Sequence, residues 1–445
     1  MGEGMATKIT VDEVDELVYH GPDGSTLILK NGKNIVIDER SSSELIDGSY
    51  NELLEALSRR ADLEWLQHEE WPSIDHTDGT MKGVDLFSGC GGISAGLWEA
   101  CRNIGLQLEM VMACDLFPAA KESYVANFAP AYFLDESIEN HVNGEIGDEF
   151  TEEERDLKAM LGDVDIVVGG PPCQGNSNLN NHTRGIDPRN ELYMRMIRFV
   201  EIFEPKYVLI ENVRGVVNAK QKVVPRANAI LEDLGYVVDH GVVKGQHIGV
   251  PQTRARHFTV AVKRKDVDVD VDVDFKTISA PTVSEPRSVG WVIEDLQNTP
   301  MTSDSIFYKT PRATKVNQDR MDWFFEDGIE GERYNLPNHL RPKCQQGDHT
   351  YPAVYGRMRW EEPAPTLTTG FGCNGRGRFT HPLEARVLSP HEAARVQTFP
   401  DFFNMRMIKK RTDLHTLIGN AVPPLMARHV LSKLFNITRE GNLAE

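Results

Sequence analysis

The sequence predicts an α/β fold in which a mostly parallel sheet carries helices on both faces. Three observations support this prediction. Short apolar segments alternate with helical segments from about residue 81 to residue 262, a pattern typical of parallel sheets. A glycine-rich turn joins the first apolar segment to a helical one. Residues 276–382, by contrast, are rich in Pro, Gly and Arg with little periodicity, which predicts a smaller, loop-rich domain.

The individual elements follow from the spacing of apolar residues. Helices are predicted at 93–104, in the segment ending at Phe128, and at 424–435, and strands at 84–87, 110–113, 164–168, 207–210 and 258–262. A further helix is predicted from Ser389, because Pro390 suits a first helical turn and Glu392 completes a capping-box pattern with Ser389.

Residues 1–80 are predicted to form a separate acidic element. Asn31-Gly32 between two apolar segments is a strong hairpin signal. Leucines near helical spacing predict an amphipathic helix over 50–66. The Asp-Val repeat at 266–274 fits an edge strand or, as we favour, a solvated linker. These features divide the chain into an extension (1–80), a sheet domain (81–265), a loop-rich domain (266–382) and C-terminal helices that return to the sheet domain (383–445).

The net charge of −19 is unevenly distributed along the chain. Residues 1–80, 134–165 and 266–275 carry net charges of −12, −10 and −5, which leaves +8 for the remaining residues. A strongly acidic protein is a poor general partner for nucleic acid, but acid confined to three segments leaves a nucleic-acid-binding face open. On charge alone, a generally acidic enzyme is an equally good interpretation.

Composition excludes several classes of protein. A hydrophobic content of 40% and a charged content of 26% are ordinary for a globular protein. No apolar run approaches the length of a membrane span, and the first residues lack the pattern of a secretory signal. The six cysteines include no Cys-x-x-Cys pair, so neither a metal site nor a disulfide framework is indicated. A reducing cytoplasm is the expected compartment.

The turn from Ser88 to Gly92 suits a nucleotide-like cofactor. Glycines let a ligand approach the backbone, and the start of a helix favours an anionic group. Asp115 ends the next strand, where ribose hydroxyls are bound in folds of this kind. Asp135, 20 residues further on, suits an adenine amino group. A tight turn without a ligand and ordinary helix N-caps are the purely structural alternatives.

The run Gly169–Gly175, with sequence GGPPCQG, presents a single cysteine just past an apolar strand. The two prolines fix the backbone ahead of Cys173, as suits a nucleophile. A thiol is mostly protonated at neutral pH, so Cys173 needs groups that activate it or its target.

Two further motifs supply candidate partners. Glu211-Asn212 follows the strand at 207–210 and reaches the same edge of the sheet, where a carboxyl group can bind or protonate a substrate ring. Arg254 and Arg256 lie two residues apart in an extended segment, point the same way, and suit a base carbonyl or a phosphate. A solvated surface pair is the alternative for these arginines.

Taken in order along the chain, six motifs resemble those of the DNA (cytosine-5) methyltransferase family in its prokaryotic form. The resemblance covers about residues 81–435. The matching segments are Asp85–Gly92, Pro171–Gln174, Glu211–Val213, Gln252–Arg256, Arg386–Gln397 and Gly419–Pro423.

The resemblance implies a Rossmann-like, S-adenosylmethionine-dependent catalytic domain and a target-recognition domain at 266–382. Cys173 would add to carbon 6 of a cytosine flipped out of duplex DNA, Glu211 would hold ring nitrogen 3, and Arg254 or Arg256 would contact the base carbonyl. The resemblance implies cofactor contacts from Phe87, Ser88, Gly89, Gly91, Gly92, Asp115, Leu116, Asp135, Pro171, Leu192 and Asn420. It implies DNA contacts from Gln174, Ser177, Arg357, Arg359, Arg376 and Arg378.

The sequence departs from the family at three places. Asp115 stands where the family more often has Glu, segment 136–163 reads as an acidic insertion, and residues 1–80 have no counterpart. For residues 1–80 we predict contact with a protein partner or mild autoinhibition. The expected role is restriction–modification or phage defence, in the cytoplasm with the nucleoid, although a solitary methyltransferase fits equally.

Two other functions compete with this one. A tRNA cytosine-5 methyltransferase shares the fold, but that branch carries a Cys-Phe-Thr element that residues 276–382 lack. A catalytically silent DNA-binding regulator is disfavoured because the Pro-Cys, Glu-Asn and Arg-x-Arg motifs are intact.

Overall fold

The computed structural model describes residues 16–20, 26–30, 34–37, 50–74, 77–172, 190–218, 222–266, 273–298, 305–326, 335–346 and 354–440. Near the N-terminus, β1 (Glu16–His20), β2 (Thr26–Lys30) and β3 (Asn34–Ile37) form a small antiparallel sheet. Pairing of Lys30 with Asn34 confirms the predicted hairpin. The sequence did not predict β1.

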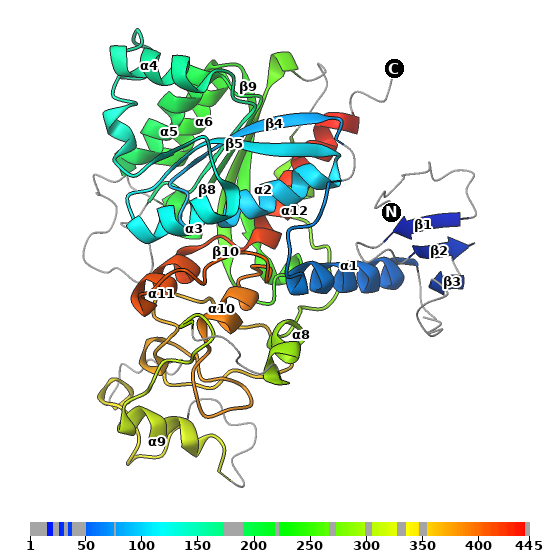
Figure 1. The fold of residues 1–445 in the computed structure, drawn as a ribbon, viewed down its shortest axis with the longest axis vertical. Coiled ribbons are helices and arrows are strands. Elements are labelled where there is room, and N and C mark those ends of the chain that lie inside the picture. The colour runs from blue at the N-terminus through cyan, green and yellow to red at the C-terminus, as the bar shows by residue number, and fades with distance from the viewer. Residues whose placement is uncertain are drawn as a thin grey trace.

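The main sheet has seven strands in the order β6-β5-β4-β7-β8-β10-β9 (Figure 1). Five neighbouring strands are parallel, and β10 runs antiparallel to both β8 and β9, so the predicted mostly parallel sheet is confirmed. The sequence did not predict β6 or β9. The bounds are β4 (Gly79–Leu86), β5 (Leu106–Cys114), β6 (Tyr132–Leu134), β7 (Ile166–Gly169), β8 (Tyr207–Val213), β9 (Tyr236–Lys244) and β10 (Ala255–Lys263).

Both faces of this sheet are buried. Consecutive residues of β7 illustrate this, because Val167 joins one apolar cluster and Val168 the other, and both are fully buried. Alternate side chains of a strand point to opposite faces, so helices must cover both. One cluster includes residues of α2 (Gly92–Asn103), α3 (Pro118–Phe128) and α12 (Pro424–Glu440), and the other includes residues of α4 (Glu152–Leu161), α5 (Asn190–Phe203) and α6 (Val223–Asp233).

The acidic segment 136–163 is packed into the sheet domain. Glu154 on α4 and Arg198 on α5 are both fully buried, and their Oε2 and Nη2 atoms lie 2.7 Å apart. Glu154 also accepts from the backbone N–H groups of Gly144 and Thr151, so the α4 capping box and the ion pair share one carboxylate. Although the sequence reads as an acidic insertion here, these contacts fix the segment to α5.

The loop-rich domain lies at the end of the molecule opposite α4, with α10 and α11 between it and the sheet (Figure 1). Its short helices include α8 (Val289–Ile293) and α9 (Lys315–Trp323), whereas α7 (Phe275–Ile278) packs against β9 and α12 of the sheet domain. The chain then returns through α10 (Pro390–Val396) and α11 (Arg411–Asn420). The predicted start of α10 is confirmed, because Ser389 and Glu392 form a capping box.

Helix α1 (Tyr50–Gln67) packs against the body of the protein. Trp65 and Leu66 belong to its main apolar core, and the Leu66 carbonyl accepts from the Asp401 N–H group at 2.9 Å. The predicted helix is confirmed, but this part of residues 1–80 is not a separate element. Strand β4 already begins at Gly79. Within the described residues, no helix combines the length and the apolar character needed to cross a bilayer.

Candidate active site

Glu211 and Arg256 meet at one edge of the main sheet. Glu211 lies near the end of β8 and Arg256 near the start of β10, which pairs antiparallel with β8. Their Oε1 and Nε atoms lie 2.8 Å apart, and both side chains are largely buried. The antiparallel direction of β10 explains the meeting, since it brings the amino end of β10 to the edge where β8 has its carboxyl end.

The environment of Glu211 favours its protonated form. Burial raises the pKa of Glu211 above its ordinary value, and the positive charges of Arg256 and Arg254 only partly oppose this effect. A carboxyl group with a raised pKa and a cation beside it can exchange a proton with a bound ring, which suits an acid–base residue.

The motif that contains Cys173 begins beside this pair. A Cβ atom built on Gly170 would lie 3.1 Å from Oε2 of Glu211, so the backbone passes directly over the carboxylate. The Asn212 side chain donates from Nδ2 to the carbonyl oxygen of Pro171 at 3.0 Å, which anchors the start of the Pro-Pro run. Cys173 follows two residues later and lies outside the described residues, as do Gln174 and Ser177.

The second arginine of the Arg-x-Arg pair has different surroundings. Arg254 is fully buried and donates to the side-chain oxygen of Gln252 and to the backbone carbonyls of Leu367 and Gly419. Arg254 thereby joins the start of β10 to Leu367 in the recognition region and to the end of α11. Its Nη1 atom has no hydrogen-bond partner among the described residues.

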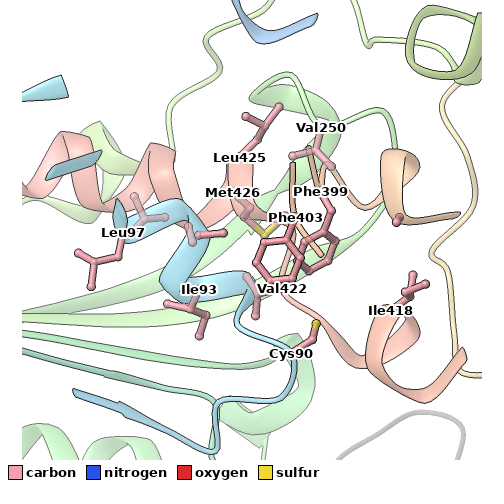
Figure 2. Packing of buried hydrophobic residues seen from close by; sticks show 14 of the residues in the cluster. Cys90, Ile93, Leu97, Val250, Phe399, Phe403, Ile418, Val422, Leu425 and Met426 are labelled. Carbon is pink, nitrogen blue, oxygen red and sulfur yellow. The ribbon is translucent and has the colours of Figure 1, made fainter. Parts of the chain in front are cut away.

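The three glycines of the glycine-rich turn fulfil two different roles. A Cβ atom on Gly91 would lie 2.6 Å from the ring of Phe128, and one on Gly92 would lie 2.3 Å from the carbonyl oxygen of Val422. These two glycines therefore permit close packing. Gly89, by contrast, has a φ of +52° and open space where a Cβ would lie, so a ligand can approach there. Figure 2 shows Ile93 of α2 in the apolar cluster with Val422.

Asp115 holds the glycine-rich turn in place. Its Oδ2 accepts from the Gly89 N–H at 2.8 Å and its Oδ1 from the Phe117 N–H at 2.8 Å. Each carboxylate oxygen has a second acceptor site, so the side chain can still bind hydroxyl groups. Phe87, at a left-handed φ of 60°, is a strained non-glycine residue of the kind found at functional sites.

Two buried polar atoms beside the turn lack partners within the described part of the chain. They are Ser88 Oγ and Asp85 Oδ1. The other oxygen of Asp85 accepts from the Ser94 hydroxyl at 2.6 Å, and that hydroxyl also contacts Tyr124 Oη at 2.7 Å. Sequence reasoning missed the Asp85–Ser94–Tyr124 network, although the position of Asp85 in the motif was a signal.

The other candidate cofactor residues differ in their burial. Leu116 is 64% exposed, Leu192 packs at the border of the apolar core, Pro171 is buried, and Asn420 is exposed at the end of α11. Asp135 forms an exposed ion pair with Lys121, with 2.8 Å between Oδ2 and Nζ.

The candidate DNA-contacting arginines fall into two groups. Arg357 donates from all three side-chain nitrogens to the backbone carbonyls of Pro382 and Phe324, so it ties the recognition region together. Arg376 is exposed, and Arg359 is 46% exposed beside Glu362. Arg378 is partly buried.

Comparisons with known proteins show the family of this chain. The model of the C-5 cytosine-specific DNA methylase family matches residues 81–436. The chain belongs to this family. It is therefore a DNA cytosine-5 methyltransferase.

Curated relatives of this methyltransferase include bacterial and plant proteins. It is 42% identical to Type II methyltransferase M1.BsuMI of Bacillus subtilis, over 83% of this chain and 85% of that protein. It is 28% identical to Type II methyltransferase M.DdeI of Desulfomicrobium norvegicum, over 82% and 92%. The match to DNA (cytosine-5)-methyltransferase 3 of Arabidopsis thaliana, at 26% identity, covers 77% of this chain but 30% of the plant protein.

Solved structures share the fold of this methyltransferase at lower identity. A prophage-encoded Escherichia coli protein assigned as a DNA modification methyltransferase superposes with a TM-score of 0.54 at 23% identity, over 81% of this chain and 99% of that one. A variant of Spodoptera frugiperda DNMT2 gives 0.53 at 18% identity, over 81% and 99%.

Proposed function

We propose that this methyltransferase uses S-adenosylmethionine to methylate carbon 5 of a flipped cytosine in a specific duplex sequence, with Cys173 as nucleophile. The observation that carries this proposal is the Glu211–Arg256 ion pair beside Gly170. It sets an acid–base group and a cation at the start of the Pro-Pro-Cys run, where a pyrimidine ring needs them.

The groups around the glycine-rich turn fit S-adenosylmethionine. The open space at Gly89 and the unpartnered Ser88 hydroxyl suit a polar ligand against the backbone. Asp115 has acceptor sites left for the ribose hydroxyls, and Phe87 offers a ring to pack against the adenine or the sulfonium group. When bound, S-adenosylmethionine supplies an electrophilic methyl group.

The residues at the sheet edge would act on the cytosine. The Cys173 thiolate forms a bond to carbon 6. The electron pair of the double bond between carbons 5 and 6 shifts towards carbon 4, so that negative charge develops at ring nitrogen 3. Glu211 stabilises this charge by holding a proton at ring nitrogen 3. Carbon 5 would then form a bond to the methyl group as the bond between that methyl group and the sulfonium sulfur breaks, with S-adenosylhomocysteine as the leaving group. A water molecule would remove the carbon 5 proton, and the double bond between carbons 5 and 6 would re-form as the Cys173 thiolate leaves. Arg256 binds the base carbonyl and orients Glu211, while Arg254 braces β10 from within the core.

DNA binding is assigned to residues on both sides of the site. Arg359, Arg376 and Arg378 would contact phosphates or base edges from the recognition region. Gln174 and Ser177 would contact the DNA around the flipped base, because carbon 5 is out of reach inside a duplex. We leave Arg357 out of this set, since its nitrogens are engaged with backbone carbonyls.

The biological role we propose is restriction–modification or a related phage defence, in the cytoplasm with the nucleoid. The similarity to Type II methyltransferases over most of both chains supports it. A protein partner for residues 1–80 stays a prediction, to be tested by copurification.

Expression in a host without cytosine methylation tests the function. Mapping methylated cytosines in that DNA should reveal one recurring sequence, and Cys173→Ala should remove the methylation. The purified enzyme should also form a covalent complex with a duplex containing 5-fluorocytosine at that sequence. Methylation of tRNA instead of duplex DNA would overturn the assignment.

A further inference from the structure

Asp62 on α1 joins two distant parts of the chain. It is 4% exposed, and each of its carboxylate oxygens is held by a different arginine. Arg287 Nη1 lies 2.5 Å from Oδ2, and Arg428 Nη2 lies 2.5 Å from Oδ1. Arg287 precedes α8 in the recognition region, whereas Arg428 lies on α12 of the catalytic domain. One buried carboxylate thus bridges the two domains.

Arg287 rests on the segment that leads to the active-site arginines. A Cβ atom on Gly249 would lie 2.7 Å from the guanidinium carbon of Arg287, so the side chain covers the turn before Gln252–Arg256. The guanidinium also lies 4.7 Å from the ring centroid of Trp291 on α8. A shift of Arg287 would therefore move both the start of α8 and the approach to Arg256.

Arg428 connects Asp62 to the cofactor side of the sheet. A Cβ atom on Gly96 would lie 2.6 Å from the backbone nitrogen of Arg428, so α12 packs tightly on α2 at this point. Helix α2 follows the glycine-rich turn directly. The position of Arg428 is thus fixed by the element that forms the cofactor site.

Other contacts hold α1 to both domains. The Glu55 carboxylate accepts from the Ser284 N–H at 2.9 Å on the recognition side. On the catalytic side, Trp65 packs edge-on against Phe402 with ring centroids 5.8 Å apart. Helix α1 therefore contacts both domains, and Asp62 lies between Glu55 and Trp65 along the helix.

The charge of Asp62 is maintained at neutral pH. Burial alone would raise the pKa of Asp62, but Arg428 and Arg287 hold it below its ordinary value. Buried groups of this kind add little net stability compared with apolar residues, because removing charges from water is costly. Directional contacts between parts of a fold can instead fix one arrangement of those parts.

We propose that Asp62 is a positioning residue for DNA recognition, and that α1 is a clamp that fixes the recognition region relative to the catalytic domain. This inference rests on the proposed function in treating residues 276–382 as the DNA-reading region. Asp62 itself touches neither DNA nor cofactor. Asp62 acts through two arginines. Arg287 positions the start of α8 in the recognition region, and Arg428 connects Asp62 to α12 of the catalytic domain.

The test compares Asp62→Asn with Glu64→Gln in the full chain. Both substitutions remove one carboxylate from α1, but Glu64 pairs only with Arg60 on the same helix among the contacts seen. Asp62→Asn should raise KM for cognate DNA about tenfold and increase methylation at sequences one base pair from cognate. The dissociation constant for S-adenosylmethionine should change less than twofold. Glu64→Gln should match the wild type in all three measurements.

Two outcomes for Asp62→Asn would overturn the proposal that α1 acts as a clamp. In one, Asp62→Asn loses thermal stability but keeps wild-type KM for DNA and wild-type sequence discrimination. In the other, cofactor affinity falls in proportion to DNA affinity, as for a general loss of structure. If Asp62→Asn does not fold, the Glu55→Ala variant takes its place, with an expected two- to threefold rise in KM for DNA. An unchanged KM there refutes the proposal. None of these outcomes affects wild-type methylation, whose absence would instead refute the proposed function.

Discussion

Arg256 on β10 donates to Glu211 on β8 across a pair of antiparallel strands, with 2.8 Å between Nε and Oε1. The two residues are 45 positions apart in the sequence, yet strand direction alone brings them to the same edge of the sheet. The positive charge of Arg256 opposes the effect of burial on the pKa of the Glu211 carboxyl, so Arg256 helps to set the protonation state of Glu211.

Replacing Glu211 with Gln should lower kcat about 100-fold or more, since a positioned acid–base group contributes roughly 10²- to 10⁴-fold. The amide keeps the shape of the side chain but cannot hold an exchangeable proton at ring nitrogen 3. Single-turnover methylation of cognate duplex measures the effect. DNA affinity from a binding assay should stay within a fewfold of wild type, and a kcat near wild type would exclude the role given to Glu211.

Replacing Arg256 with Met should change the pH dependence as well as the rate. The pKa of Glu211 is raised by burial, and Arg256 opposes that rise, so removal of Arg256 should raise the pKa further. If the protonated carboxyl is the active form, the rate falls as pH increases through this pKa. The alkaline limb of the kcat profile should therefore move to higher pH in Arg256→Met, while kcat itself falls. A limb that moves to lower pH would contradict the proposed pairing.

Replacing Asn212 with Ala removes the hydrogen bond to the Pro171 carbonyl at the start of the Cys173 motif. Loss of a buried hydrogen bond costs about 1–3 kcal/mol, equivalent to roughly 5- to 150-fold in a rate that depends on it. The rate of covalent trapping by a 5-fluorocytosine duplex should fall by this amount. Asn140→Ala provides the control, because Asn140 donates to Glu136 on the surface. Equal trapping rates in the two variants would count against the role of Asn212.

Asp85 should make the stability of the protein depend on pH. Burial, with a contribution from Asp115 and against a hydrogen bond from Ser94, raises the pKa of Asp85 from 3.8 to about 7. A raised pKa means that the folded state binds the proton more tightly than the unfolded state. The stabilisation from Asp85 is thus complete below about pH 4 and is lost as pH rises towards 7. Asp85→Asn should flatten the Tm profile between about pH 4 and 7, and an unchanged profile would refute this.

Replacing Glu154 with Gln should destabilise the sheet domain by about 3 kcal/mol, because it removes the fully buried carboxylate that pairs with Arg198 and leaves Glu201 as the remaining counter-charge among the described residues. Urea denaturation measures this loss. Asp319→Asn, which breaks the exposed Lys315–Asp319 pair on α9, should cost less than about 1 kcal/mol. Equal losses in the two variants would show that segment 136–163 is not the integral part of the domain that its contacts indicate.

Local patterns in the sequence were enough to predict most of the catalytic domain. The strand at 84–87, the helix that follows Gly92 and the capping box at Ser389 were confirmed because each depends on neighbouring residues. Strand β9 was missed because its alternation is interrupted by the polar run Asp239-His240, and its pairing with β10 depends on distant residues.

The candidate site shows the same division. The motifs predicted that Glu211 would reach the edge of the sheet that carries Cys173, and the family resemblance implied that Arg254 or Arg256 would contact the same base. They did not distinguish Arg256 from Arg254, because the difference comes from the carbonyls of Leu367 and Gly419, which lie 113 and 165 positions along the chain from Arg254. The bridging role of Asp62 likewise depends on two arginines more than 200 residues away.

The hydrogen bonds that connect Gln252, Thr253 and Arg254 to the recognition region use main-chain atoms of Ala364 and Leu367. Thr253 N–H donates to the carbonyl of Ala364 at 2.9 Å, Gln252 Oε1 accepts from the N–H of Leu367 at 3.0 Å, and Arg254 donates to the Leu367 carbonyl. Any residue whose backbone follows the same path presents the same N–H and C=O groups. The hydrogen bonds of this joint therefore depend on the backbone course at residues 364–367 rather than on particular polar side chains there, while the buried side chains of Ala364 and Leu367 restrict which residues fit.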